Sequence, residues 1–148
     1  MVLLTLVLHQ VSHAELIGFY SFDDPENPLK DSSNQGNDLT SVEADPTFAS
    51  EGGFEGGAFV FDGSQRLVSP VNINPSVHSK VTFGAWVKTA TLESGLYKAI
   101  GHDNGGWDRT IGLDNRSGSF RYTSFIGNGR PVVGTPGPVS TDNWTFLA

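Results

Sequence analysis

One segment of the chain is dense in short side chains that carry oxygen, and it reads DSSNQGND from Asp31 to Asp38. Calcium takes about six to eight oxygen ligands from carboxylates, amide side chains and backbone carbonyls, which irregular Asp/Asn/Gly loops supply readily. The spaced acidic positions and terminal Glu of an EF-hand are absent from this segment. The composition therefore predicts either a calcium-binding loop or an Asx-rich turn without a metal.

Two tryptophans have surroundings that suit contact with a sugar, because a pyranose presents an apolar face and a rim of hydroxyl groups. Trp107 follows Asp103 and Asn104 in a Gly-rich stretch, where we expect a loop tip with an exposed ring. Trp86 alternates with apolar neighbours and is predicted to face away from them, although it could instead pack beneath a loop. The hypothesis is a carbohydrate site formed by Trp107, Asp103, Asn104 and Trp86.

Catalytic groups are not arranged in any pattern that an enzyme of this size would need. Glycoside hydrolysis requires two carboxyl groups across the scissile bond, and the nearest pair of glutamates, Glu51 and Glu55, falls in the loop-like sequence SEGGFEGG. No Ser lies in a Gly-x-Ser-x-Gly sequence, and beyond residue 14 only His78 and His102 remain as bases for a triad. We therefore expect a protein that is not an enzyme.

Composition narrows the class of protein further. The 148 residues include 18 Gly and 8 Pro, which suits a single domain of short strands and tight turns. A net charge of -7 disfavours nucleic acid as a partner, since a phosphate backbone requires a field of Lys and Arg. The absence of cysteine excludes disulfides and thiol catalysis.

The first 14 residues resemble a secretion signal. An apolar run from Val2 to Leu8 precedes a small-x-small pattern that ends at Ala14, although a basic region before the run is missing. The run is too short to span a bilayer, so no membrane insertion is expected. We predict a signal peptide at 1–14 and a secreted or cell-surface domain at 15–148; the alternative is that the run forms a buried first strand.

Short apolar or alternating segments bounded by Gly, Asn, Asp or Pro predict an all-β protein. The clearest is Lys80–Lys88, in which Val81, Phe83, Ala85 and Val87 share one face. The expected strands are Leu16–Phe22, Ala58–Phe61, Arg66–Ser69, Lys80–Lys88, Leu96–Gly101, Thr110–Asp114, Ser119–Ile126 and Trp144–Leu147. Because the last of these reaches almost to the final residue, we expect a sandwich that is incomplete at its C-terminus and unstable alone.

Five motifs occur in a familiar order: YSFDD at 20–24, DSSNQGND at 31–38, GGAFVFDGSQRLVSP at 56–70, VTFGAWVKT at 81–89 and DNWTFLA at 142–148. Together they resemble the laminin G-like domain of secreted, mostly bacterial proteins, a member of the concanavalin A-like lectin and glucanase superfamily. The resemblance implies an antiparallel jelly-roll β-sandwich. It also implies one calcium ion, for which Asp31, Asn37 and Asp62 are the matching positions here.

The same resemblance implies a function in binding or adhesion, with a carbohydrate or glycoprotein as ligand and with other domains of a larger secreted protein as neighbours. Fold alone does not fix function. Two alternatives therefore stay open: a structural domain that spaces parts of a surface protein, and a fragment of a glycoside hydrolase.

Overall fold

The computed structural model describes residues 14–90, 93–102, 109–116, 120–127, 133–135 and 139–148. Within these ranges the regular structure is entirely β and every strand pair is antiparallel, which confirms the predicted all-β class. The strands are β1 (Thr40–Val42), β2 (Thr47–Ala49), β3 (Ala58–Val60), β4 (Arg66–Val68), β5 (Ala85–Lys88), β6 (Leu96–His102), β7 (Arg109–Asp114), β8 (Arg121–Phe125), β9 (Val133–Gly134) and β10 (Trp144–Leu147). No helix that could cross a bilayer is found in the described part of the chain.

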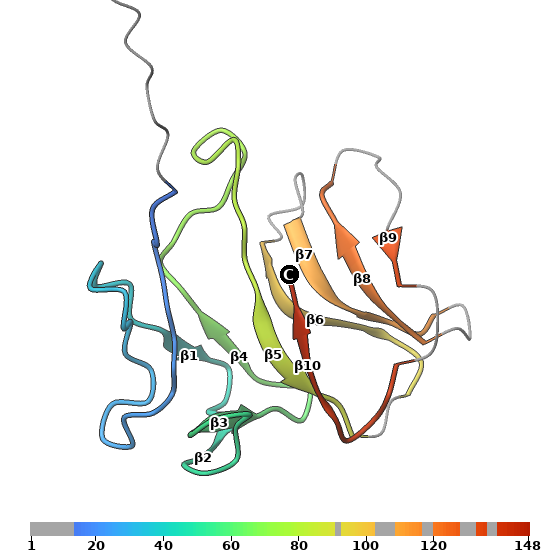
Figure 1. Cartoon of the computed structure of the whole chain (residues 1–148), viewed down its shortest axis with the longest axis horizontal. Helices are drawn as coiled ribbons and strands as arrows, with labels where there is room; N and C mark the ends of the chain where they lie inside the picture. Colours follow the sequence, from blue (N-terminus) through green and yellow to red (C-terminus); the bar gives the residue numbers. More distant parts are fainter. Residues whose placement is uncertain (1–13, 91–92, 103–108, 117–119, 128–132, 136–138) are drawn as a thin grey trace, which may run out of the picture.

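The strands form one sheet of four and three pairs. β6, β7, β8 and β9 follow one another in the largest sheet, while β5 pairs with β10, far away in the sequence. β1 pairs with β4, and the β2–β3 hairpin lies between those two strands in the chain. Figure 1 places β5 and β10 in the middle of the molecule, with β1 to β4 on one side and the four-stranded sheet on the other.

The first predicted strand, Leu16–Phe22, is wrong. This segment makes no strand ladder, and its Phe19 amide instead donates to the side chain of Asp31, at 3.0 Å. Phe22 ends the extended segment because it adopts a φ of 60°, a left-handed conformation that a bulky residue rarely takes. Side chains of a polar loop thus take the place of a neighbouring strand.

Lys80–Lys88 is a strand only in its second half, where β5 begins at Ala85. The predicted alternation nevertheless holds along the whole segment, since the residues at 81, 83, 85 and 87 are half-buried and those between them are exposed. Trp86 therefore faces away from the apolar stripe, as predicted. β1, β2 and β9 were not predicted, because two or three residues are too few to show a period of two.

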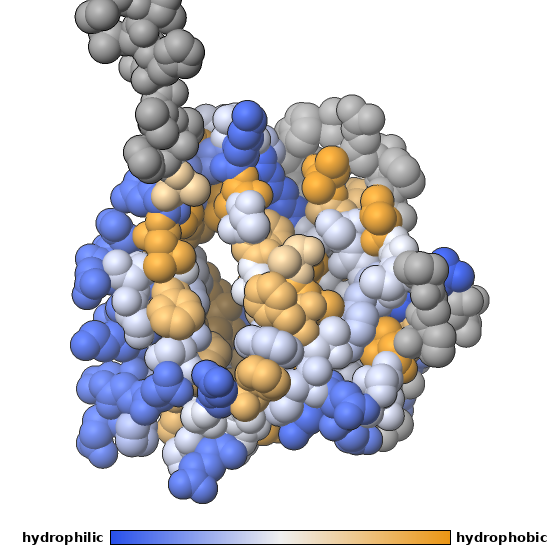
Figure 2. All heavy atoms as spheres, viewed as in Figure 1, coloured by the Kyte–Doolittle hydropathy of each residue, from blue (hydrophilic) through white to orange (hydrophobic). Residues whose placement is uncertain are grey.

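The apolar core is thin. Among the described residues the buried apolar side chains are Ala58, Ile111, Leu113, Val139 and Leu147, and none of them is fully buried. Figure 2 shows apolar atoms gathered in the middle of the visible face, where Figure 1 places β5 and β10. Much of the apolar surface of this domain therefore faces solvent in the isolated chain.

Candidate functional site

The carboxylate of Asp31 is the centre of the loop at residues 31–38, hereafter the Asp31 loop. Asp31 is only 4% exposed. Its Oδ1 atom accepts hydrogen bonds from the amides of Phe19 (3.0 Å) and Ser33 (2.8 Å). Its Oδ2 atom accepts from the Ser33 hydroxyl (2.8 Å) and from the Asn37 amide (3.0 Å). Each oxygen of this carboxylate thus accepts two hydrogen bonds, which occupy its lone pairs.

Further hydrogen bonds tie the Asp31 loop to the N-terminal segment. The Asn37 side-chain amide donates to the Ile17 carbonyl at 2.6 Å, and the Ser32 amide donates to the Phe19 carbonyl at 2.7 Å. The Tyr20 hydroxyl donates to the Asn37 carbonyl at 2.7 Å and also lies 2.7 Å from the hydroxyl of Ser69. The loop is therefore bound to the N-terminal segment, and Tyr20 of that segment contacts Ser69, just after β4.

These contacts set the charge state of the loop. Burial raises the pKa of the Asp31 carboxyl group, but hydrogen bonds from Phe19, Ser33 and Asn37 outweigh burial and hold the pKa well below its ordinary value. Burial raises the pKa of the Tyr20 phenol, and the nearby charge of Asp31 raises it further. Asp31 is therefore an anion whose charge is stabilised by protein donors at neutral pH.

The predicted calcium ligands differ in their surroundings. Asp31 and Asn37 are hydrogen-bonded to each other, as described above, whereas Asp62 lies in the exposed turn between β3 and β4. There its carboxylate accepts from the amide (2.9 Å) and hydroxyl (2.7 Å) of Ser64, which lower the pKa of Asp62. A calcium ion at the Asp31 loop would have to displace the donors that already occupy Asp31.

The described residues also contain no group of three or more His, Cys, Asp or Glu side chains placed to hold a metal ion. The arrangement of Asp31 thus agrees with the Asx-rich turn that the sequence left as the alternative. Calcium binding stays a prediction of the sequence alone, and the four hydrogen bonds that Asp31 accepts argue against it.

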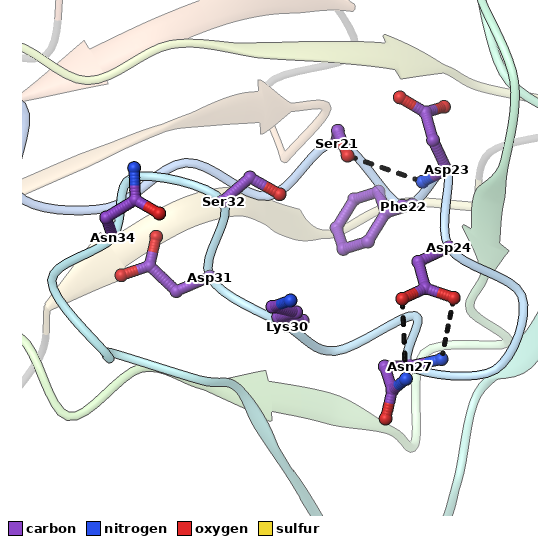
Figure 3. A pocket seen from close by; sticks show the side chains of 9 residues that line it. All are labelled: Ser21, Phe22, Asp23, Asp24, Asn27, Lys30, Asp31, Ser32 and Asn34. Carbon is purple, nitrogen blue, oxygen red and sulfur yellow. Dashed lines mark hydrogen bonds between the residues drawn. The ribbon is translucent and has the colours of Figure 1, made fainter.

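A polar recess of about 260 Å³ lies beside the Asp31 loop. Figure 3 shows Asp31 and Asn34 at one end of it and Asp24 and Asn27 at the other. The Asp24 carboxylate accepts from the amides of Glu26 (3.1 Å) and Asn27 (3.3 Å), so it closes its own turn. The polar lining of the recess suits ordered water. The recess is lined by Ser21, Phe22, Asp23, Asp24, Asn27, Lys30, Asp31, Ser32 and Asn34.

A second candidate site lies on the outward face of β5 and β10. Trp86 is opposite Phe146 in the register of this pair, and their ring centroids lie 5.4 Å apart with planes tilted by 52°. The ring of Phe54 stacks on Trp86, with centroids 3.8 Å apart and planes only 7° from parallel. We name Phe54, Trp86 and Phe146 the aromatic patch.

The aromatic patch is open to solvent although it is apolar. Phe54 is 51% exposed, Trp86 is 45% exposed and Phe146 is 54% exposed. Gly84 makes room for the ring of Phe146, because a Cβ atom at this position would lie 2.7 Å from Cζ of that ring. The same face continues to Lys88, whose ammonium group lies 5.2 Å from the centroid of the Trp144 ring, a cation–π contact.

Of the predicted sugar-binding residues, only Trp86 can be placed. Asp103, Asn104 and Trp107 lie outside the described residues. Neither Phe54 nor Phe146 was predicted as part of the site. Phe54 could not be predicted, because its contact with Trp86 joins a loop to a strand that is distant in the sequence. A signal for Phe146 did exist, because Trp144 and Phe146 alternate along the last strand.

Comparisons of the chain with family models, with curated proteins and with solved structures gave no match. The laminin G-like resemblance therefore rests on the sequence motifs alone.

The Asp31 loop should make folding sensitive to acid. Since the pKa of Asp31 is lower in the folded chain than the ordinary value of about 3.9, its stabilisation is complete above that value and is lost as the pH falls below it. We expect the urea midpoint to be unchanged down to about pH 4 and to fall between about pH 4 and about pH 2. Asp31→Asn should lower the midpoint at neutral pH and flatten this dependence.

The matched control for this experiment is Asp45→Asn, which changes an exposed aspartate elsewhere in the chain. It should keep the pH dependence of the parent chain. An Asp31→Asn variant with the same urea midpoint as the parent at neutral pH, and the same fall of that midpoint in acid, would contradict the assigned role of Asp31.

Calcium should have little effect on the Asp31 loop, because its central carboxylate already accepts four hydrogen bonds. We expect the same Tm, measured by differential scanning fluorimetry at neutral pH, in millimolar calcium and in EDTA. A rise in Tm with calcium that disappears in Asp31→Ala would instead establish the calcium site that the sequence predicts.

Proposed function

We propose that this chain is a secreted, non-catalytic module that binds carbohydrate through the aromatic patch. The observation that carries the proposal is the position of Trp86, which is half exposed on the outward face of β5 and is flanked by Phe54 and Phe146. Trp86 and Phe146 are held on paired strands, so their rings offer apolar surface at little cost in conformational entropy.

The chemistry of a sugar matches such a surface. The C–H groups on one face of a pyranose are apolar, so they can pack on aromatic rings while the hydroxyl groups stay in contact with water or polar side chains. Glu51 and Glu55 are exposed on the same loop as Phe54, and their carboxylates could accept hydrogen bonds from sugar hydroxyls. Stacking together with a polar rim would give both affinity and orientation.

Three further parts of the proposal depend on the sequence. The concanavalin A-like jelly roll is proposed from the order of the motifs, and the antiparallel all-β structure supports it. Secretion is proposed from the apolar run from Val2 to Leu8 and the small-x-small pattern that ends at Ala14. Absence of catalysis is proposed because Glu51 and Glu55 lie on the loop between β2 and β3 rather than side by side on a strand.

A structural spacer within a larger surface protein is the second candidate, and the exposed apolar side chains outside the aromatic patch favour it. Val60, Phe61 and Val68 on or beside β3 and β4 are each more than a third exposed. Exposed apolar surface of this kind is often covered by a neighbouring domain. If the chain is such a spacer, it would bind no glycan.

Trp86→Ala should reduce glycan binding without unfolding the chain. On an array of neutral and charged glycans we expect the parent chain to bind neutral pyranosides, and we expect the variant to bind at least about tenfold more weakly. Phe61→Ala is the matched control, because Phe61 is similarly exposed (48%) and belongs to a different cluster.

Two results would count against the proposal. Binding that is equal in the parent and Trp86→Ala would remove the aromatic patch from the site, and binding to no glycan would favour the spacer. Release of reducing sugar from a bound glycan would contradict the absence of catalysis.

A further inference from the structure

Phe54 occupies the position on Trp86 that a stacked ligand would take. Its ring lies 3.8 Å from the indole and within 7° of parallel. A sugar ring that packs on an aromatic surface would also lie parallel to it and in van der Waals contact, with carbon atoms about 3.5–4.0 Å apart. One face of Trp86 is thus covered by a side chain of the protein itself.

The loop that carries Phe54 has a short tip on a closely packed base. Phe54 lies between two glycine pairs, Gly52-Gly53 and Gly56-Gly57, in the connection from β2 to β3. The tip consists of Phe54 and Glu55, and Phe54 is 51% exposed, so its ring can leave Trp86 by rotation of the side chain without movement of the glycines.

The base of the loop is fixed by close backbone contacts. The Gly53 amide donates to the Gly56 carbonyl at 2.9 Å, and the Gly52 amide donates to the Ala49 carbonyl at 3.2 Å. Gly57 is buried, and a Cβ atom there would lie 2.1 Å from the carbonyl oxygen of Phe22. A change confined to the tip would therefore leave the β2–β3 hairpin in place.

We propose that Phe54 is an internal plug that a glycan displaces from Trp86. This inference rests on the proposed function, because it concerns the regulation of the same site. With the plug in place the binding-competent state is only fractionally populated, so the apparent Kd is the intrinsic Kd divided by that fraction. A ligand that covers a larger part of the aromatic patch overcomes the plug more easily, which favours oligosaccharides over single sugars.

The opposite role for Phe54 is a fixed part of the binding surface, and the two roles predict opposite effects of one substitution. If Phe54 is a plug, Phe54→Ala frees the face of Trp86 and tightens binding. If Phe54 contacts the ligand, Phe54→Ala removes a contact and weakens binding. The sign of the change in Kd therefore decides between them.

The experiment is a calorimetric titration of the parent chain, Phe54→Ala, Trp86→Ala and Phe61→Ala with cellotetraose, xylotetraose and chitotetraose. Removal of a stacked ring should tighten the binding of at least one of these sugars by about fivefold in Phe54→Ala. Trp86→Ala should lose this binding, and Phe61→Ala should leave the Kd of the parent unchanged. Binding in Phe54→Ala but not in the parent would also support the plug.

Binding in Phe54→Ala that is equal to or weaker than that of the parent would overturn the plug, and it would leave the proposed function intact if Trp86→Ala still loses affinity. No binding of any of the three sugars by either the parent or Phe54→Ala would overturn both. Phe54→Leu serves as a second variant in case alanine perturbs the loop, because it keeps an apolar side chain but lacks a flat ring. It should tighten binding less than Phe54→Ala does, and binding weaker than that of the parent would count against the plug.

Discussion

The buried carboxylate of Asp31 is the interaction on which the arrangement of the described structure depends most. It accepts hydrogen bonds from Phe19, Ser33 and Asn37, and so it joins two stretches of chain that form no strand ladder with each other. Without it, several backbone amides of the Asp31 loop and the N-terminal segment would lose their acceptors, which is costly for groups partly removed from water.

A short series of contacts leads from Asp31 to the base of the loop that carries Phe54. The segment that it holds leads to Phe22, whose ring lies edge-on against Phe59 of β3 at 5.1 Å. The carbonyl oxygen of Phe22 lies directly against Gly57, where no Cβ atom would fit, and the carboxylate of Asp23 lies against Gly56. The base of the loop that carries Phe54 is therefore held against the N-terminal segment.

The sequence predicted those features that depend on local periodicity. The outward direction of Trp86 follows from a period of two, and the strands from Leu96 to Phe125 are close to those expected because Gly and Asn clusters separate them. The segment at 16–22 has the same apolar character as a strand, yet its backbone bonds to side chains of the Asp31 loop and to the Ser32 amide, which strand propensity does not reveal.

The functional surface was predictable only in part. The composition of the Asp31 loop suits both a metal site and an Asx turn, because both need short side chains with oxygen atoms. Only the hydrogen-bond partners of Asp31 separate the two. The contact between Phe54 and Trp86 joins positions 32 residues apart in the chain, and no local pattern specifies such a pairing.

Carbohydrate binding at the aromatic patch, as proposed, requires that a glycan contact Trp86. It is tested most directly by the NMR signal of the Trp86 indole N–H, assigned by its loss in Trp86→Ala, during titration with a neutral oligosaccharide such as cellotetraose. We expect a saturable shift of this signal that is larger than the shift of the Trp144 indole signal. Saturable binding that leaves the Trp86 signal unmoved would contradict the proposal.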